Sequence, residues 1–166
     1  MEYAILLGAV VCMLSVWATT LYYGIGPMPA STDAVEHMLS CVTAEQELHE
    51  LGAGFGGMAV RAAIRFPQKR ICAYEGSPLP FLVCWFRSLK HSNLQVKLCN
   101  FERLTFPHGV CLLCYLSPIG MKRLSNGLSG WSGTLISYEF ACRPHQPERI
   151  VELNNLYQSK VLVYKL

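Results

Sequence analysis

The sequence of 166 residues predicts an α/β protein: a doubly wound, mostly parallel sheet with a C-terminal antiparallel hairpin, preceded by one transmembrane helix. Three observations predict this fold class. Short apolar strands alternate with helical segments, a glycine-rich turn separates the first strand from the next helix, and an uncharged apolar stretch precedes both. Hydrophobic residues make up 52% of the chain, which at this length supports one core and argues against two independent globular domains.

The uncharged stretch covers residues 3–23. A helix of about 20 apolar residues is long enough to span the hydrocarbon layer of a bilayer. A cleaved signal peptide is the alternative, but it needs a basic segment before the apolar run, and the only charge there is Glu2. We therefore expect a retained membrane anchor over residues 1–23, a Gly/Pro linker over residues 24–30 and one domain over residues 31–166.

Composition argues against two classes of function. Charged residues make up 15% of the chain and the formal net charge is +3, with the basic residues scattered rather than clustered, so we expect no nucleic-acid partner. The eight cysteines lie mostly in apolar stretches, which favours reduced thiols over a disulfide framework. Cys111 and Cys114 form a C-x-x-C pair inside an apolar strand, and no second pair completes four ligands, so we expect no metal site.

The domain begins at Ser31, a good N-cap for a helix that carries Val35, Met38 and Leu39 on one face. The segments that follow alternate between strand and helix patterns. In order, they are strand 48–51, helix 58–65, strand 70–75, helix 80–89, strand 94–99, strand 110–116, helix 121–128 and strand 134–140.

The C-terminal segments 149–153 and 160–166 are expected to pair as the antiparallel hairpin, although residues 148–156 could instead form a helix. The first strand fits its expected central place poorly. Its residues Glu47, His49 and Glu50 are polar, and parallel strands buried on both faces are usually apolar.

The glycine turn, Glu50-Leu-Gly-Ala-Gly-Phe-Gly-Gly57, is the most informative part of the sequence. Glycines permit a tight turn and let a cofactor approach the backbone, and the following helix N-terminus offers N–H donors. Glu75 ends the next strand, where an acid can accept hydrogen bonds from a ribose diol. NAD and S-adenosylmethionine both suit this pattern, but too little chain follows Glu75 for the second half or substrate domain of a dehydrogenase.

The turn resembles the first motif of class I, Rossmann-like S-adenosylmethionine-dependent methyltransferases, and Glu75 resembles their ribose-binding acid. The terminal hairpin lies where this class inserts an antiparallel strand. The segments 26–31, 115–124 and 133–140 are similar to the small membrane-anchored protein lysine methyltransferases of mitochondria and their bacterial relatives. The resemblance covers nearly the whole chain.

The resemblance implies S-adenosylmethionine as cofactor and a set of residues that bind it. Glu50 and the turn residues Gly52, Ala53, Gly54 and Gly56 would surround its methionine end. Glu75 and Gly76 would hold the ribose, and Asn100, followed by Phe101, would meet the adenine. The family usually has Asp at the position of Asn100. The amide oxygen of Asn100 can still accept a hydrogen bond, although it carries no charge. The alternative is that Asn100 only begins a turn.

For the methyl transfer itself, alignment of the acceptor with the sulfonium supplies much of the acceleration. A lysine acceptor must lose its proton, and Tyr115, Ser117 and Glu139 lie at the ends of predicted strands where they could assist. We expect a protein substrate, in or beside the same membrane, and a single-pass protein whose catalytic domain faces the cytoplasm. The alternative is a non-catalytic cofactor-binding or scaffold module with the same fold.

Overall fold

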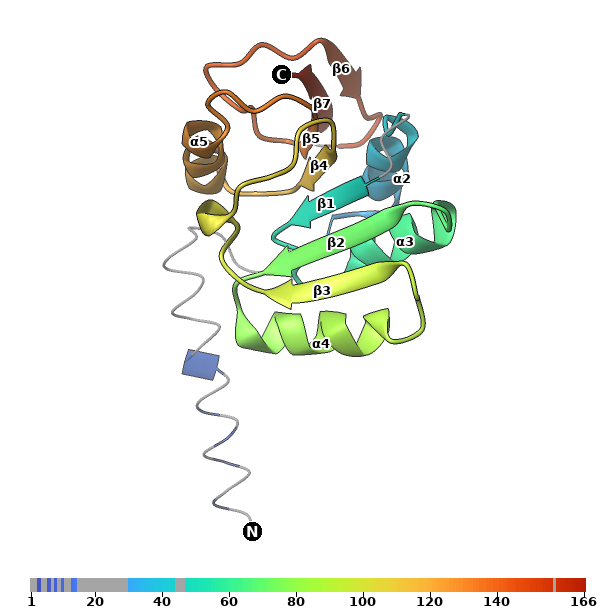
Figure 1. Ribbon diagram of the computed structural model, residues 1–166, viewed down its shortest axis with the longest axis vertical. Coiled ribbons are helices and arrows are strands. Elements are labelled where there is room, and N and C mark those ends of the chain that lie inside the picture. Colours follow the sequence, from blue (N-terminus) through green and yellow to red (C-terminus); the bar gives the residue numbers. More distant parts are fainter. Residues whose placement is uncertain are drawn as a thin grey trace.

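The structure, a computed structural model, describes residues 30–43, 47–156 and 158–166, and nearer the N-terminus Tyr3, Leu6, Gly8, Val10, Met13 and Leu14. Strands alternate with helices as the sequence predicts (Figure 1). The elements are α2 (Thr32–Ser40), β1 (Glu47–Leu51), α3 (Gly57–Arg65), β2 (Arg70–Glu75), α4 (Pro78–Ser88), β3 (Leu94–Leu98), the 3-10 turn η1 (Phe101–Arg103), β4 (Cys111–Cys114), α5 (Pro118–Gly127), β5 (Thr134–Tyr138), β6 (Arg149–Glu152) and β7 (Lys160–Lys165).

The sheet has seven strands in the order β3-β2-β1-β4-β5-β7-β6. The strands β1 to β5 pair in parallel, whereas β7 is antiparallel to both β5 and β6. This confirms the predicted doubly wound sheet with a C-terminal antiparallel hairpin. The alternative of a helix over residues 148–156 is wrong, because β6 occupies most of the first half of that range. The order reverses between β1 and β4, so the carboxyl ends of these strands form the edge at which such sheets bind ligands.

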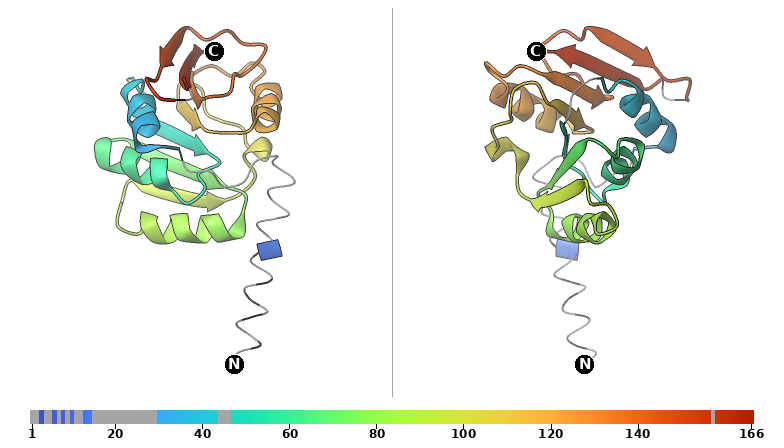
Figure 2. Two further views of the ribbon diagram at one scale, coloured as in Figure 1. Left: turned by 180° about the vertical axis from the view of Figure 1, so that it is seen from behind. Right: turned by 45° about the vertical axis from the view of Figure 1, so that its right-hand side comes forward.

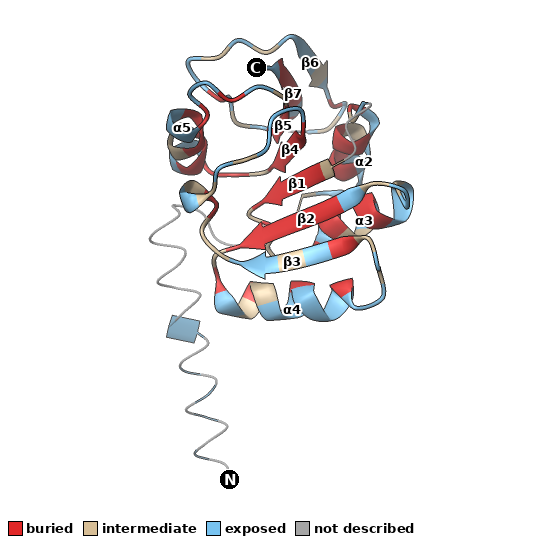
Figure 3. Ribbon diagram, viewed as in Figure 1, coloured by how far each residue is buried: buried red, intermediate tan, exposed pale blue. Residues whose placement is uncertain are grey.

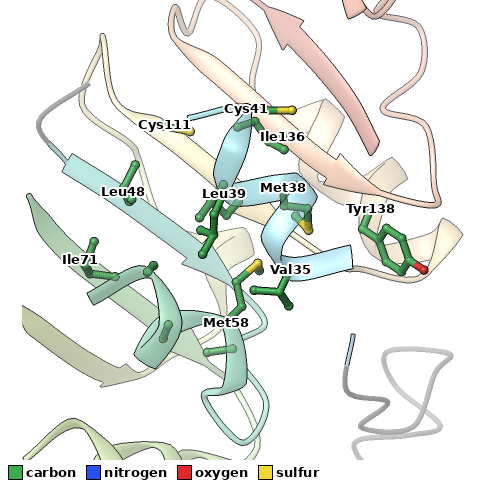
Figure 4. Packing of buried hydrophobic residues seen from close by; sticks show 14 of the residues in the cluster. Val35, Met38, Leu39, Cys41, Leu48, Met58, Ile71, Cys111, Ile136 and Tyr138 are labelled. Atoms are coloured by element: carbon green, nitrogen blue, oxygen red, sulfur yellow. The ribbon is translucent and has the colours of Figure 1, made fainter. Parts of the chain in front are cut away.

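Three helices, α2, α3 and α4, cover one face of the sheet, and α5 and η1 lie on the other (Figure 2, right). Ser31 caps α2 as predicted, since its hydroxyl oxygen accepts from the Ala34 N–H at 3.2 Å. Figure 4 shows the apolar side of α2, with Val35 and Met38, in the cluster that also holds Leu48 of β1. Packing of this kind fixes the first face around the central strand.

The second face is covered more thinly. Residues 99–110, which connect β3 to β4, form only the short turn η1 and no longer helix. Along β3 only Leu94 is buried, and Gln95 and Lys97 are exposed. The second core is therefore concentrated under α5, around Leu112 and Met121, at the other half of the sheet.

Hydrogen bonds within the fold explain two of the polar residues in the first strand, His49 and Glu47. His49 is buried and stacks on Tyr74, with ring centroids 5.7 Å apart. Its Nδ1 lies 2.9 Å from the Tyr74 hydroxyl and its Nε2 lies 3.3 Å from a Glu47 carboxylate oxygen. Burial lowers the pKa of His49, although the hydrogen bond to Glu47 opposes this. The neutral ring that burial favours donates to Glu47 and accepts from Tyr74, so these polar groups are paired as burial requires.

The membrane prediction needs correction. The expected anchor over residues 1–23 and the linker over residues 24–30 lie outside the described residues, apart from Ala30 and the six positions near the N-terminus. In the part of the chain that the structure describes, no helix is long and apolar enough to cross a membrane. A spanning helix needs about 20 apolar residues, and the helices α2 to α5 have 9 to 11. The predicted single-pass location, with the domain facing the cytoplasm, is therefore wrong.

Candidate cofactor and active site

The glycine turn joins the carboxyl end of β1 to α3. Gly52, Gly54 and Gly56 all have positive φ, at 73°, 55° and 79°, a conformation that glycine adopts without steric cost. The N–H groups of Gly52 and Ala53 both donate to the Tyr74 carbonyl oxygen, at 2.9 and 3.0 Å. The turn is thereby tied to the end of β2, beside Glu75.

Glu75 holds the two sides of the candidate site together. One carboxylate oxygen accepts from the Gly54 N–H and the other from the Ser77 N–H, each at 2.7 Å. The Glu75 carbonyl oxygen accepts from the Cys99 N–H at 2.9 Å. The side chain is buried, yet each carboxylate oxygen can accept a further hydrogen bond. This places a buried hydrogen-bond acceptor at the edge where the turn, β2 and the segment after β3 meet.

Glu50 lies beside Glu75 at the end of β1 and is buried. Its Oε2 is the buried side-chain oxygen without a hydrogen-bond partner in the described part of the chain. Burial, reinforced by the charge of Glu75 and opposed by the Ala59 N–H, raises the pKa of Glu50 to about 8. An unpaired buried carboxyl oxygen is costly. A cationic donor, such as the ammonium group of a bound amino acid, would satisfy it.

Gly56 fits closely against α4. A Cβ at Gly56 would lie 2.6 Å from the Cys84 sulfur and 3.3 Å from its Cα. At Gly54, in contrast, a Cβ would meet nothing within 4 Å. The turn is therefore packed against α4 at one glycine and open at the other, which leaves space over Gly54 for a ligand.

Gly56→Ala should lower the free energy of unfolding by about 2–4 kcal/mol, because it adds a methyl group against Cys84 at a φ that favours glycine. Gly109→Ala is the matched control, since Gly109 has a similar φ of 76° and a Cβ there would meet nothing within 4 Å; we expect a loss of about 1 kcal/mol at this position. Urea unfolding measures both. Equal losses would show that the contact with α4 has no energetic role.

The segment after β3 begins with the turn η1, which Asn100 caps. The Asn100 amide oxygen accepts from the Glu102 N–H at 3.0 Å and so caps η1. A lone pair of that oxygen remains for another donor. Phe101 is buried in the second core, and Gly76 is half-buried between Glu75 and Ser77. That Asn100, Phe101 and Gly76 bind a cofactor stays a prediction.

The three predicted catalytic residues follow β4 and β5. Tyr115 is half-buried and makes an edge-to-face contact with Tyr138, with ring centroids 4.9 Å apart. Burial raises the pKa of Tyr115, and the nearby Tyr138 and Glu139 add to the effect. Tyr115 and Glu139 are therefore brought to one region, where the Glu139 side chain is exposed.

Ser117 and Glu139 also have local structural roles. Ser117 is buried at the start of α5, where its oxygen accepts from the Gly120 N–H at 3.1 Å. This is an ordinary N-cap interaction. Glu139 has a φ of 70°, and its N–H donates to the Lys160 carbonyl oxygen at 2.8 Å. A positive φ at a residue other than glycine is uncommon and is enriched at functional sites.

Two residues of the site were missed by the sequence prediction. Ser77 supplies a backbone N–H that donates to Glu75. Its position directly before Pro78 indicates the start of a helix, where backbone N–H groups are free to donate, so the sequence did contain a signal for it. Cys84 packs under Gly56, and burial with the charges of Glu50 and Glu75 raises the pKa of its thiol to about 12. The thiol is thus protonated at neutral pH. No local sequence pattern indicates the contact between Cys84 and Gly56, because it depends on where α4 packs in the folded protein.

No metal-binding cluster is found at the site: within the described ranges, no group of three His, Cys, Asp or Glu residues could hold an ion. Neither a protein-family model nor a curated protein sequence matches the chain.

Solved structures do match the chain, and several of them are methyltransferases. An RNA methyltransferase from Salinibacter ruber has a TM-score of 0.74 and 19% identity, covering 83% of this chain and 93% of its own. TrmK from M. capricolum gives a TM-score of 0.63 at 9% identity, over 82% and 68% of the two chains. Geranyl diphosphate C-methyltransferase from Streptomyces coelicolor gives 0.57 at 16%, over 72% and 62%.

All three were solved with S-adenosyl-homocysteine. At these identities the matches establish a shared fold, namely the Rossmann-like fold of class I S-adenosylmethionine-dependent methyltransferases. They do not support the finer resemblance to membrane-anchored lysine methyltransferases.

Proposed function

We propose that this protein binds S-adenosylmethionine at the edge formed by the glycine turn, Glu50 and Glu75, and transfers its methyl group to an acceptor. The observation that carries the proposal is the pair of buried carboxyl groups. Glu75 is oriented by two backbone N–H groups at 2.7 Å, and Glu50 has a buried oxygen with no partner among the described residues.

These residues fit the parts of the cofactor. The ribose diol is a double donor, which suits the Glu75 carboxylate. The ammonium group of the methionine portion is cationic, which suits the Glu50 oxygen. The space over Gly54 admits the ligand between them. The solved neighbours with S-adenosyl-homocysteine support the same choice by analogy of fold.

In this arrangement the bound cofactor supplies an electrophilic methyl group on a cationic leaving group. The residues of this chain orient the reactants. Glu50 and Glu75 hold the cofactor at the carboxyl ends of β1 and β2, and Tyr115 and Glu139 lie at the ends of the neighbouring strands β4 and β5. The exposed Glu139 carboxylate would accept the proton that an amine acceptor must lose before it attacks.

For the acceptor, we propose a protein lysine first. The aromatic pair Tyr115 and Tyr138 with the Glu139 carboxylate suits an amine that arrives as a cation. RNA is the second candidate, supported by the RNA methyltransferase among the solved neighbours. The basic side chains of this chain are scattered along its sequence, which weighs against RNA. A cofactor-binding scaffold without methyl transfer is the third candidate.

Calorimetry with the full chain tests the first step: S-adenosylmethionine and S-adenosyl-homocysteine should bind, and NAD should not. Absence of binding at millimolar cofactor in a folded sample would overturn the proposal. The transfer step is then measured with labelled methyl groups on total protein and total RNA. Gly54→Arg fills the open space over the turn and should abolish the label.

The same assay separates the candidates. Label removed by protease and recovered as methyllysine supports the lysine acceptor, whereas label removed by ribonuclease supports RNA. Equal labelling by the normal chain and Gly54→Arg, together with cofactor binding by the normal chain, would favour the scaffold.

A further inference from the structure

The outer face of α4 is largely apolar and exposed. Its exposed large hydrophobic residues are Leu82, Val83, Trp85 and Phe86, followed by Leu89 at the C-cap, with exposed fractions between 37% and 63%. In Figure 3, most of α4 is drawn as exposed. Pro80, Cys84 and Ser88 are its buried residues. A helix on a protein surface normally shows the opposite pattern, with its apolar side facing the core.

The exposed face has the geometry of a helix-binding surface. Leu82, Phe86 and Leu89 follow the i, i+4, i+7 spacing by which one helix contacts another. Trp85 lies edge-on to Phe86, with ring centroids 5.0 Å apart. The basic residue within α4, Arg87, donates to the Phe55 carbonyl oxygen at 2.8 Å and is therefore already engaged. The face thus offers mainly apolar contact to a partner.

The size of the face limits what can cover it. A helix of 11 residues is about 16 Å long. That length matches one crossing helix. A stable dimer between two copies buries about 800 Å² per partner, which a three-turn helix does not supply by itself. The occupant that fits is a single uncharged helix.

The same chain has helical, exposed apolar residues near its N-terminus. Tyr3, Leu6, Val10 and Met13 are helical, and their exposed fractions are 86%, 63%, 38% and 65%. Their spacing of three, four and three residues places them along one side of a helix. No charge occurs over residues 3–23. We call these four residues the N-terminal stripe.

We propose that the N-terminal stripe packs against the exposed face of α4 in the same molecule, so that each covers apolar surface of the other. Residues 15–29 link the last described residue of that segment to Ala30, and a chain of this length reaches up to about 50 Å. The radius of gyration of a domain of this size is about 14 Å, so every surface of the domain is within reach. A tether of this length also gives an effective concentration that favours contact within one molecule.

Photo-crosslinking in the full chain tests the proposal. A benzophenone amino acid replaces Phe86, the protein is irradiated in the intact expressing cells, and the adducts are mapped by mass spectrometry. We expect adducts at residues 3–17 of the same molecule, which leave the protein at its monomer mass. The same probe at Ile150 of β6, another exposed apolar residue, at the far end of the sheet from α4, is the control and should give none.

Val10→Glu sharpens the test, because a carboxylate facing an apolar helix is penalised. It should reduce the adduct yield from position 86 about tenfold, a factor that corresponds to about 1.4 kcal/mol, whereas Gly8→Ser should leave the yield unchanged. Adducts to a second copy, to another protein or to lipid would overturn the proposal. So would a yield at residues 3–17 that Val10→Glu does not change.

Discussion

Glu50→Gln should stabilise the cofactor-free protein at pH 8 and at the same time weaken its binding of S-adenosylmethionine. Burial raises the pKa of Glu50 from the usual 4.5 to about 8. Between these values the folded protein holds a proton that the unfolded chain has released, so the free energy of unfolding falls as the pH rises. Glutamine is neutral in both the folded and the unfolded protein, so the variant does not show this fall in the free energy of unfolding.

The expected gain at pH 8 is about 3–5 kcal/mol, since each unit of pKa difference corresponds to about 1.4 kcal/mol. At pH 5 both side chains are largely neutral in the folded protein, and the two proteins should have similar stability. Urea unfolding at the two pH values provides the comparison. Glu148→Gln, at an exposed position just before β6, is the control and should behave as the normal chain at both.

Burial favours the protonated form of Glu50, whereas the bound cofactor should favour its ionised form, because an ammonium group pairs best with a carboxylate. Binding to the normal chain should therefore release a proton near pH 7, detected by calorimetry in two buffers of different ionisation enthalpy. The variant should bind more weakly and release fewer protons. If the two proteins bind with equal affinity and proton release, Glu50 does not contact the ammonium group.

Glu75→Ala should weaken the binding of S-adenosylmethionine by about 1–3 kcal/mol, which is about 5- to 150-fold. The substitution removes the acceptor of the Gly54 and Ser77 N–H groups as well as the proposed ribose acceptor. Glu75→Gln keeps one acceptor oxygen and should lose less. Calorimetry on samples that unfold cooperatively measures both. Unchanged affinity of the alanine variant would place the ribose elsewhere.

Local patterns were enough to predict the elements of the fold. The N-cap at Ser31 and the alternation of strands and helices depend on neighbouring residues, and the structure confirms them. Ends of elements were less accurate: the expected strand 110–116 ends at Cys114, and α5 begins three residues earlier than expected, at Pro118. Turns and caps at these ends depend on contacts with other strands, which local patterns do not specify.

The site was predictable where it depends on sequence spacing and unpredictable where it depends on packing. The turn and Glu75 could be paired because a strand and a helix fix their separation. The contact of His49 with Tyr74 joins neighbouring strands 25 residues apart, and no pattern in either strand indicates it. Residues 80–89 are apolar except for Arg87 and Ser88, a composition typical of a buried helix. That α4 lies at the edge of the sheet, over β3, depends on tertiary packing and could not be predicted from it.

The position of β7 between β5 and β6 makes this one strand responsible for the end of the sheet. β6 precedes β7 in the chain, yet it pairs with β7 and not with β5. Removal of β7 would therefore leave β6 without a partner and β5 with an unpaired edge. Open edges of this kind attract other extended chains, so a chain truncated before Lys160 should aggregate.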